Sequence, residues 1–189
     1  MNPFKTTLFH FASVVLFAST PLAPAAEGPV NIIFDSDVDH DCDDVAALFM
    51  LHAAVERGEA KLLATIGCTS TDEIAPALEA INTWFGRPEI PVGTLKDKGF
   101  LDHKGFAREL IEHYPSKFRS GKDYPDATVL YRETLAKQPD GSVIVLAVGP
   151  LRNLANLLKS GPDKASPLDG PALIAKKVRR LEVMGGTYP

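Results

Sequence analysis

A dense run of carboxylates is the part of this sequence with the clearest capacity for chemistry. Six of its ten residues are aspartate, in the segment Asp35-Ser36-Asp37-Val38-Asp39-His40-Asp41-Cys42-Asp43-Asp44. Like charges this close repel by roughly 1 kcal/mol per pair even in water-like surroundings. A hard divalent cation would offset that repulsion, and ligation by oxygen alone favours calcium or magnesium over zinc. The alternative is a solvated acidic loop.

The spacing of the first three aspartates also matches the start of an EF-hand calcium loop, but the rest of that motif is missing. His40 stands where the loop needs glycine for its sharp turn, and Ala46 stands where a bidentate glutamate is required. The run also follows an apolar, β-branched segment instead of a helix. An EF-hand is therefore excluded.

Apolar segments alternate with segments of helical spacing along the rest of the chain. The expected strands are 30–34, 61–67, 90–93, 142–148 and 181–184, and the expected helices are 45–55, 74–85, 104–113, 126–137 and 151–158. Strands that are apolar throughout predict an α/β fold, with a mostly parallel sheet covered by helices on both faces. Ligands of such sheets bind beyond the carboxyl ends of the strands. That rule brings segments 35–44, 67–72 and 148–150 to one edge.

Composition narrows the function classes. The 189 residues carry a formal net charge of −4, with 45% hydrophobic and 23% charged residues, which is typical of a folded globular protein. A sequence pI near 5.7 disfavours nucleic acid as a partner. Two cysteines, Cys42 and Cys68, cannot form a disulfide scaffold or a four-cysteine zinc site.

The N-terminus has the pattern of a secretory signal peptide. Lys5 is followed by the apolar stretch Leu8–Phe17 and by the small-residue pattern Ala23-Pro24-Ala25. We expect residues 1–25 to direct export to the periplasm or the medium, and residues 26–189 to form one domain. No second apolar stretch is long enough to span a membrane, so we expect no membrane association after cleavage.

Two enzyme families share an Asp-x-Asp motif directly after a strand. Ile32-Ile33-Phe34-Asp35-Ser36-Asp37-Val38 is similar to the first motif of haloacid dehalogenase-like phosphatases, with Asp35 as nucleophile. That family also needs an acidic pair after a late strand, where this chain has Gly185-Gly186-Thr187. The phosphatase is therefore the weaker alternative.

The fuller resemblance is to the nucleoside hydrolases, the inosine-uridine preferring N-ribohydrolases. Segment 32–48 resembles a longer variant of their N-terminal signature, and three later segments agree with it in order and content. They are Leu62–Ile66 with Arg87–Gly93, Val145–Ala155, and Leu181–Gly186. The resemblance implies a Rossmann-like core and hydrolysis of the N-glycosidic bond of ribonucleosides. It also implies a calcium cofactor, with magnesium as the less favoured ion, and allows a homo-oligomer.

The resemblance also implies a role for individual residues. Asp37 would be calcium ligand and general base, Asp44 a bidentate calcium ligand, and Val148 a ligand through its backbone carbonyl. Asp43 would bind the ribose hydroxyls, and Met184 would line the ribose pocket.

The acidic loop departs from the family pattern, which leaves other assignments open. Asp39 has the spacing to Asp43 of the shorter, more familiar motif and could take the place of Asp37. Asp35 and Asp41 are further alternates. The family's remaining site residues lie beyond a Met-Gly-Gly strand, so we expect the C-terminal part of the fold to be missing. The second hypothesis is therefore a catalytically incomplete member that binds a divalent cation.

A few further expectations concern single side chains. We expect Cys42 and Cys68 to be buried thiols, Trp84 and Phe85 to lie in the core, and His103 and His113 to lie at the surface. Thr71 or Asp72 is the expected cap of the second helix. Asn153 is expected to form hydrogen bonds at the start of its helix.

Overall fold

The computed structural model describes residues 28–39, 41–102 and 104–186. The strands are β1 (Val30–Ser36), β2 (Ala60–Gly67), β3 (Val92–Thr94), β4 (Val143–Ala147) and β5 (Val178–Val183). The helices are α1 (Asp43–Glu56), α2 (Ile74–Trp84), α3 (Ala107–His113), α4 (Ala127–Ala136), α5 (Arg152–Lys159) and α6 (Gly170–Lys177). A short 3-10 turn, η1, spans Gly121–Asp123.

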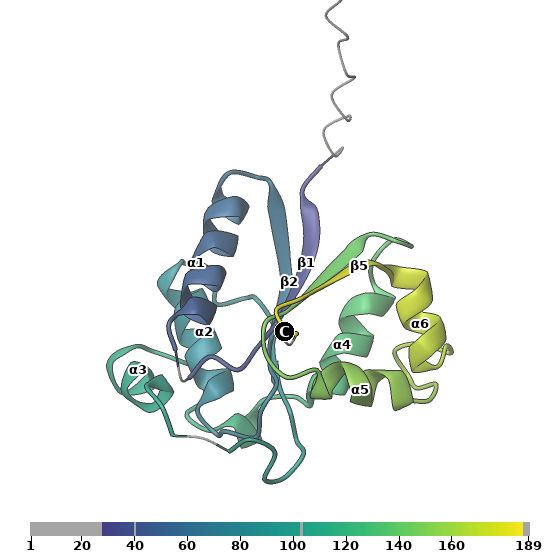
Figure 1. Ribbon diagram of the computed structural model, residues 1–189. Helices are drawn as coiled ribbons and strands as arrows, with labels where there is room; N and C mark the ends of the chain where they lie inside the picture. Colours follow the sequence, from purple (N-terminus) through teal and green to yellow (C-terminus); the bar gives the residue numbers. More distant parts are fainter. Residues whose placement is uncertain (1–27, 40, 103, 187–189) are drawn as a thin grey trace, which may run out of the picture.

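These strands form one sheet in the order β3-β2-β1-β4-β5, and every pair between them is parallel. The central strand β1 pairs with β2 on one side and β4 on the other. The predicted α/β class is therefore confirmed (Figure 1). Because all carboxyl ends point the same way, the loops after β1, β2 and β4 meet at one edge, as the sequence predicts.

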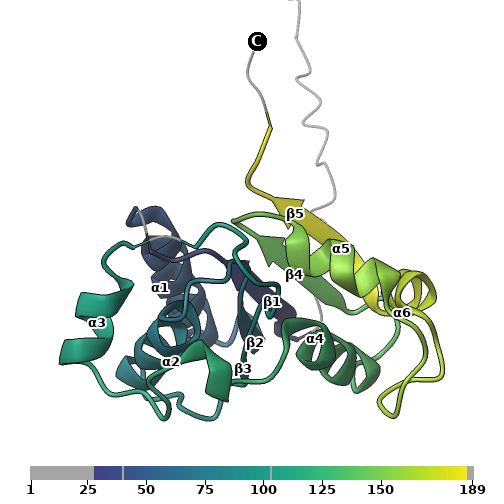
Figure 2. The ribbon, with the colours of Figure 1, turned by 90° about the horizontal axis from the view of Figure 1, so that it is seen from below.

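Helices lie on both faces of the sheet. Figure 2 shows α1, α2 and α3 to one side and α4, α5 and α6 to the other. Successive side chains of a strand point to opposite faces. Ile32 and Phe34 of β1 accordingly join the core under α1 and α2, whereas Ile33 joins the core under α4 to α6. The apolar character of β1 at every position follows from this double burial.

Local chemistry sets the ends of several helices. Asp126 accepts hydrogen bonds from the N–H groups of Thr128 and Val129 and so caps α4, as predicted. Helix α1 ends before Gly58, whose φ of +72° is a conformation that glycine adopts without strain. Neither expected cap serves α2, because Glu73 occupies that position and makes no capping bond with its side chain. Asp72 instead accepts from Ser120 Oγ at 2.8 Å.

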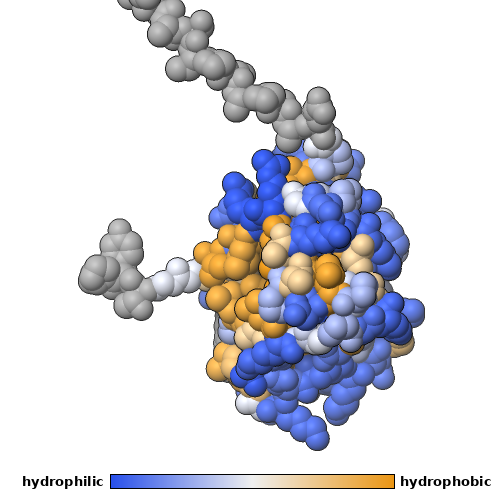
Figure 3. All heavy atoms as spheres, turned by 90° about the vertical axis from the view of Figure 1, so that its right-hand side faces the viewer, coloured by the Kyte–Doolittle hydropathy of each residue, from blue (hydrophilic) through white to orange (hydrophobic). Residues whose placement is uncertain are grey.

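The β5 end of the sheet carries exposed apolar side chains. Leu181, Val183 and Met184 are each 43–55% exposed, and Figure 3 shows an apolar patch on this side of the molecule. An open groove of about 530 Å³ lies between α1 and this end of the sheet; Phe34, Met50, Val148 and Met184 are among its lining residues.

Two expectations about single elements are corrected. β5 begins at Val178, three residues before the expected strand 181–184, so it includes Arg179 and Arg180. Trp84 is 66% exposed and packs edge to face on Tyr114, whereas Phe85 packs against the core as expected. His113 is exposed as predicted, and His103 lies outside the described residues. Within the described ranges, no helix has the length and apolarity needed to cross a membrane.

Candidate active site at the carboxyl ends of β1, β2 and β4

The loops that follow three strands begin side by side. Asp35 of β1 pairs with Ile66 of β2 and Ala147 of β4. The backbone N–H of Val148 donates to the carbonyl of Asp35 at 2.9 Å, and that of Cys68 donates to the carbonyl of Ser36 at 2.9 Å. Side chains that follow each strand therefore share one edge of the sheet.

Asp35 is buried and held by polar groups of other elements. Its Oδ2 accepts a hydrogen bond from the Tyr131 hydroxyl of α4 at 2.7 Å and from Asn153 Nδ2 of α5 at 3.1 Å. Burial raises the pKa of Asp35 to about 7, although the bonds from Tyr131, Asn153 and the Cys68 thiol lower it. Asp35 thus fastens the end of β1 to α4 and α5.

Asn153 does more than the local bonding expected at a helix start. Besides its bond to Asp35, its Nδ2 donates to the carbonyl of Gly67 at 3.0 Å. The side chain therefore joins α5 to the ends of two strands. Tyr131 is a site residue that sequence reasoning misses, because in the sequence it looks like an ordinary aromatic residue of an apolar helix face. The only signal is general: a buried tyrosine hydroxyl usually needs a polar partner.

Ser36 and Asp44 form a second buried contact on the opposite face. Ser36 Oγ donates to Asp44 Oδ2 at 2.6 Å and accepts from the N–H of Val38 at 3.1 Å. Asp44 lies in the first turn of α1, where the helix dipole stabilises negative charge. Burial, together with the charges of Asp37, Asp43 and Asp41, raises the pKa of Asp44 to about 6, although the bond from Ser36 lowers it.

Asp37 lies between β1 and the loop after β4. A Cβ atom added at Gly149 would fall 2.6 Å from Cys68 Sγ and closer still to Asp37 Oδ1. Only glycine at position 149 leaves room for this carboxylate. The charge of Asp37 contributes to raising the pKa of Asp35, Asp44 and Cys68, so these four groups lie within electrostatic range of one another.

The structure places Asp39 toward α3. Its Oδ1 accepts a hydrogen bond from the N–H of Ala107, the first residue of α3, at 2.8 Å, and its carbonyl accepts from Phe106 at 3.0 Å. The other carboxylate oxygen, Oδ2, is buried and has no hydrogen-bond partner among the described residues. One carboxylate oxygen of Asp39 therefore binds the first residue of α3, and the other binds no group that the structure describes.

Asp41 and Asp43 form an exposed pair. Their carboxyl groups hydrogen-bond each other, which raises the pKa of Asp41 and lowers that of Asp43. Asp43 is the first residue of α1. Cys42 between them is exposed, which corrects the expectation of a buried thiol, whereas Cys68 is buried as expected. His40 lies outside the described residues.

The remaining predicted residues follow β4 and β5. Val148 is half-buried, and the N–H of Met184 donates to the carbonyl of Ala147 at 2.9 Å. Both side chains line the 530 Å³ groove. Met184 is 55% exposed there, on the side of the sheet that α1 covers.

The oxygen ligands at this edge are of the type that a hard cation prefers, but few side chains supply them. Asp37, which lies beside Gly149 of the loop after β4, and Asp44, whose pKa the charge of Asp37 helps to raise, supply carboxylate oxygens, and oxygen donors are what calcium prefers. Within the part of the chain that the structure describes, no three acidic, histidine or cysteine side chains converge as a metal-binding group. The fit is therefore to two carboxylates supplemented by other oxygens.

The chain matches the model of a known protein family. The family model described as inosine-uridine preferring nucleoside hydrolase matches residues 32–189. This match favours the nucleoside hydrolase interpretation of the Asp-x-Asp motif over the phosphatase. The sequence gives no significant match among curated proteins.

Solved structures share the fold at low identity. A plant nucleoside hydrolase, the PpNRh1 enzyme, is 20% identical with a TM-score of 0.58 over 84% of this chain and 48% of its own. The type III effector protein XopQ, solved with adenosine diphosphate ribose, is 19% identical with a TM-score of 0.61, and the effector protein XOO4466 is 17% identical with 0.66. Both cover 86% of this chain and 45% of their own. This chain thus spans about half the length of these structures.

The contact between Tyr131 and Asp35 gives a first prediction. Burial beside Asp35 keeps the pKa of Tyr131 well above its ordinary value, so its hydroxyl remains a donor. Tyr131→Phe should lower the free energy of unfolding by about 1–3 kcal/mol, since a buried carboxyl loses a donor. The loss should be greater at pH 8 than at pH 5, because the lost bond is stronger once Asp35 ionises, and its pKa is about 7. Urea denaturation at both pH values measures it.

Tyr114→Phe is the matched control, because Tyr114 is 42% exposed and contacts Trp84 through its ring. Its effect should stay within about 0.5 kcal/mol. Equal losses in the two variants would contradict the role given to the Tyr131 hydroxyl.

The space at Gly149 gives a second prediction. Gly149→Ala should lower the free energy of unfolding by about 1–3 kcal/mol, because the new methyl group collides with Asp37 and Cys68. Gly161→Ala has no atom within 4 Å of the new methyl group and should be neutral or slightly stabilising. Thermal and urea denaturation of both variants compare them; a neutral Gly149→Ala would show that Asp37 can move aside without cost.

Proposed function

This chain belongs to the family of inosine-uridine preferring nucleoside hydrolases, and we propose that it takes part in calcium-assisted hydrolysis of the N-glycosidic bond of ribonucleosides. The family is generally metal-dependent. The observation that carries the proposal is the position of Asp37, directly after the central strand and beside the loop after β4, within electrostatic range of Asp44 in the first turn of α1. Family membership is a finding, whereas the activity of this half-length chain is the proposal.

We propose that Asp37, Asp44 and the carbonyl of Val148 hold the cation. Two features of the structure support this choice. The charges of Asp37, Asp43 and Asp41 contribute to raising the pKa of Asp44, so a cation would relieve a repulsion between these groups. Asp35 binds Tyr131 and Asn153, and one oxygen of Asp39 binds Ala107, so these two carboxylates have structural roles. A bound calcium ion would supply an activated water and chelate ribose hydroxyls.

The chain's own residues would carry out the remaining steps. One carboxylate oxygen of Asp37 would accept the proton of the attacking water, which is general-base chemistry. The negative charges of the cluster would stabilise the positive charge that develops on the ribose ring as the bond to the base breaks. Asp43 would accept hydrogen bonds from the ribose hydroxyls, and Met184 would contact the sugar from the end of β5.

The alternative is a member of the family that binds a divalent cation but lacks activity by itself. It is favoured by one observation: this chain spans about half the length of the solved nucleoside hydrolase that shares its fold. The two functions differ in one measurable respect, because both require cation binding and only the first releases a free base.

Calcium binding and base release together test the proposal. Calcium should raise the melting temperature of the wild-type chain, and a chelator should abolish the increase; a saturating ion at 100 times its Kd contributes about 2.7 kcal/mol. Asp44→Asn and Asp37→Asn should lose most of this increase, because each removes one of two carboxylate ligands. Release of hypoxanthine from inosine should fall by roughly 100-fold or more in Asp37→Asn, the expected loss for a general base.

Asp123→Asn is the control, because Asp123 is an exposed aspartate of η1. It should keep both the melting shift and the activity. A melting shift without base release would favour the inactive cation-binding member, and the absence of both would contradict the hydrolase and the cation site. Magnesium in place of calcium tests the choice of ion.

We further propose that residues 1–25, which lie outside the described residues, direct export of the protein. The support is the order of Lys5, the apolar stretch Leu8–Phe17 and Ala23-Pro24-Ala25. N-terminal sequencing of protein recovered outside the cytoplasm of a producing bacterium should begin at residue 26 or 27. A retained Met1 in exported protein, or retention of the whole chain inside the cell, would contradict a cleaved signal.

A further inference from the structure

A cavity of about 550 Å³ opens at the carboxyl ends of β2 and β3, next to the carboxylate cluster. It is lined by the segment after β2, the loop after β3 and the turn η1; the residues that matter below are Ser70, Thr94, Lys96, Lys98 and Lys122. Cys68 and Asp37 both lie next to Gly149. Ser70 is two residues after Cys68, so their Cα atoms are at most about 7 Å apart. The cavity and the cluster thus share one edge of the sheet.

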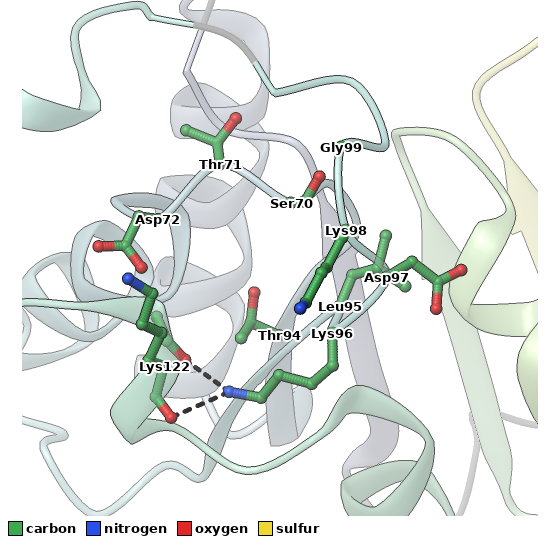
Figure 4. A pocket seen from close by; sticks show the side chains of 11 residues that line it. Ser70, Thr71, Asp72, Thr94, Leu95, Lys96, Asp97, Lys98, Gly99 and Lys122 are labelled. Carbon is green, nitrogen blue, oxygen red and sulfur yellow. Dashed lines mark hydrogen bonds between the residues drawn. The ribbon is translucent and has the colours of Figure 1, made fainter.

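Positive charge faces this cavity. Three lysines line it, and Figure 4 shows the Lys98 side chain extending into the space above Thr94. Of the two lining aspartates, Asp97 points away and pairs with Arg152 Nε at 2.5 Å. The bond from Arg152 is the main reason that the pKa of Asp97 is low. The other lining aspartate, Asp72, accepts a hydrogen bond from Ser120 Oγ at 2.8 Å. The cavity is therefore positive, although the chain is acidic as a whole.

One lysine builds the cavity wall, and the other two are available to a ligand. Lys96 Nζ donates to the carbonyl of Gly121 at 2.7 Å and to that of Lys122 at 3.2 Å, which joins η1 to the loop after β3. An ammonium has three protons, so Lys96 keeps one. Within the described part of the chain, the ammonium groups of Lys98 and Lys122 make no hydrogen bond or ion pair.

A hydroxyl group lies among these cations. Thr94, the last residue of β3, is 3% exposed as a whole residue and lines the cavity. Its hydroxyl is a donor, and a ligand oxygen in the cavity would accept its proton.

We propose that this cavity is an anion subsite that binds a phosphate group, and that the ligand at this edge of the sheet is a phosphorylated ribonucleoside. Phosphate offers several acceptor oxygens in different directions, which suits separate ammonium donors and a hydroxyl. A planar carboxylate is matched better by a guanidinium, and no arginine lines the cavity. The volume exceeds that of one phosphate group and falls within the range of small-ligand pockets, so part of the attached nucleoside also fits.

The two ends of this edge have opposite polarity. The carboxylates after β1 suit a cation and a sugar diol, and the lysines of the loop after β3 and of η1 suit an anion. A ligand with a ribose at one end and a phosphate at the other matches both. The ribonucleoside part of this assignment rests on the proposed function, whereas the anion subsite rests on the cavity alone.

Pyrophosphate titration tests the subsite without any nucleoside. Isothermal calorimetry with the full chain in calcium-free buffer of low ionic strength should show saturable binding. Lys98→Gln/Lys122→Gln should weaken it at least tenfold, because two charge-assisted contacts are lost. Lys61→Gln/Lys164→Gln removes the same charge from exposed lysines outside the cavity and should bind as the wild type does. Absence of saturable binding, or equal weakening in both double variants, would overturn the subsite.

A second titration compares adenosine 5′-monophosphate with adenosine in the presence of calcium. The wild type should bind the monophosphate at least tenfold tighter, and Lys98→Gln/Lys122→Gln should abolish that preference. Pyrophosphate binding without any binding or cleavage of nucleosides would support the subsite and contradict the proposed function. Cleavage of nucleosides without pyrophosphate binding would do the reverse.

Discussion

The end of β1 is fixed to both helical layers by two adjacent side chains, and the arrangement of the site depends on that double attachment. Asp35 points to one face and binds Tyr131 and Asn153, and Ser36 points to the other and binds Asp44. The alternation of strand side chains makes this possible within two residues. A buried carboxyl without such donors would be strongly destabilising. Burying these polar side chains is costly unless they are hydrogen-bonded, so their partners on α1, α4 and α5 must lie next to the end of β1.

The same constraint distributes the six aspartates of the acidic run. Like charges in one loop must be separated, neutralised or bound by donors. Asp35 and Asp39 accept hydrogen bonds from distant elements, and Asp41 and Asp43 share a hydrogen bond at the surface. Asp44 accepts a hydrogen bond from Ser36, and the charge of Asp37, which lies beside the loop after β4, contributes to raising the pKa of Asp44. The run therefore contains three kinds of carboxylate, although the residue type is the same.

Much of the fold could be predicted from the sequence, because the information is local. Double burial makes β1, β2 and β4 apolar at nearly every position, and that pattern alone predicts a parallel sheet and the edge where its loops meet. Asp126 caps α4 by accepting hydrogen bonds from Thr128 and Val129, two and three residues further along, so its role is also local. The acidic run was located correctly for the same reason.

The parts that could not be predicted depend on contacts between distant residues. Nothing near Tyr131 in the sequence indicates that its hydroxyl meets Asp35, 96 positions away. Trp84 has helical spacing to core residues, but the neighbouring surface of α3 leaves two thirds of it exposed. Asp39 was weighed as a substitute for Asp37 on spacing alone, and only the approach of α3 shows what its carboxylate binds.

Negative and positive side chains are grouped in different loops at this edge of the sheet. This separation favours a ligand that has a neutral or cation-bound end and an anionic end. The acidic residues follow the central strand β1, where helix α1 begins and its dipole favours negative charge. The lysines lie in the loop after β3 and in η1, which Lys96 joins through hydrogen bonds to the carbonyls of Gly121 and Lys122. Opposite charges on an exposed surface would normally pair, yet Lys98 and Lys122 do not reach the cluster and are bound to nothing else that the structure describes. Their separation leaves both ends able to act on one bound molecule.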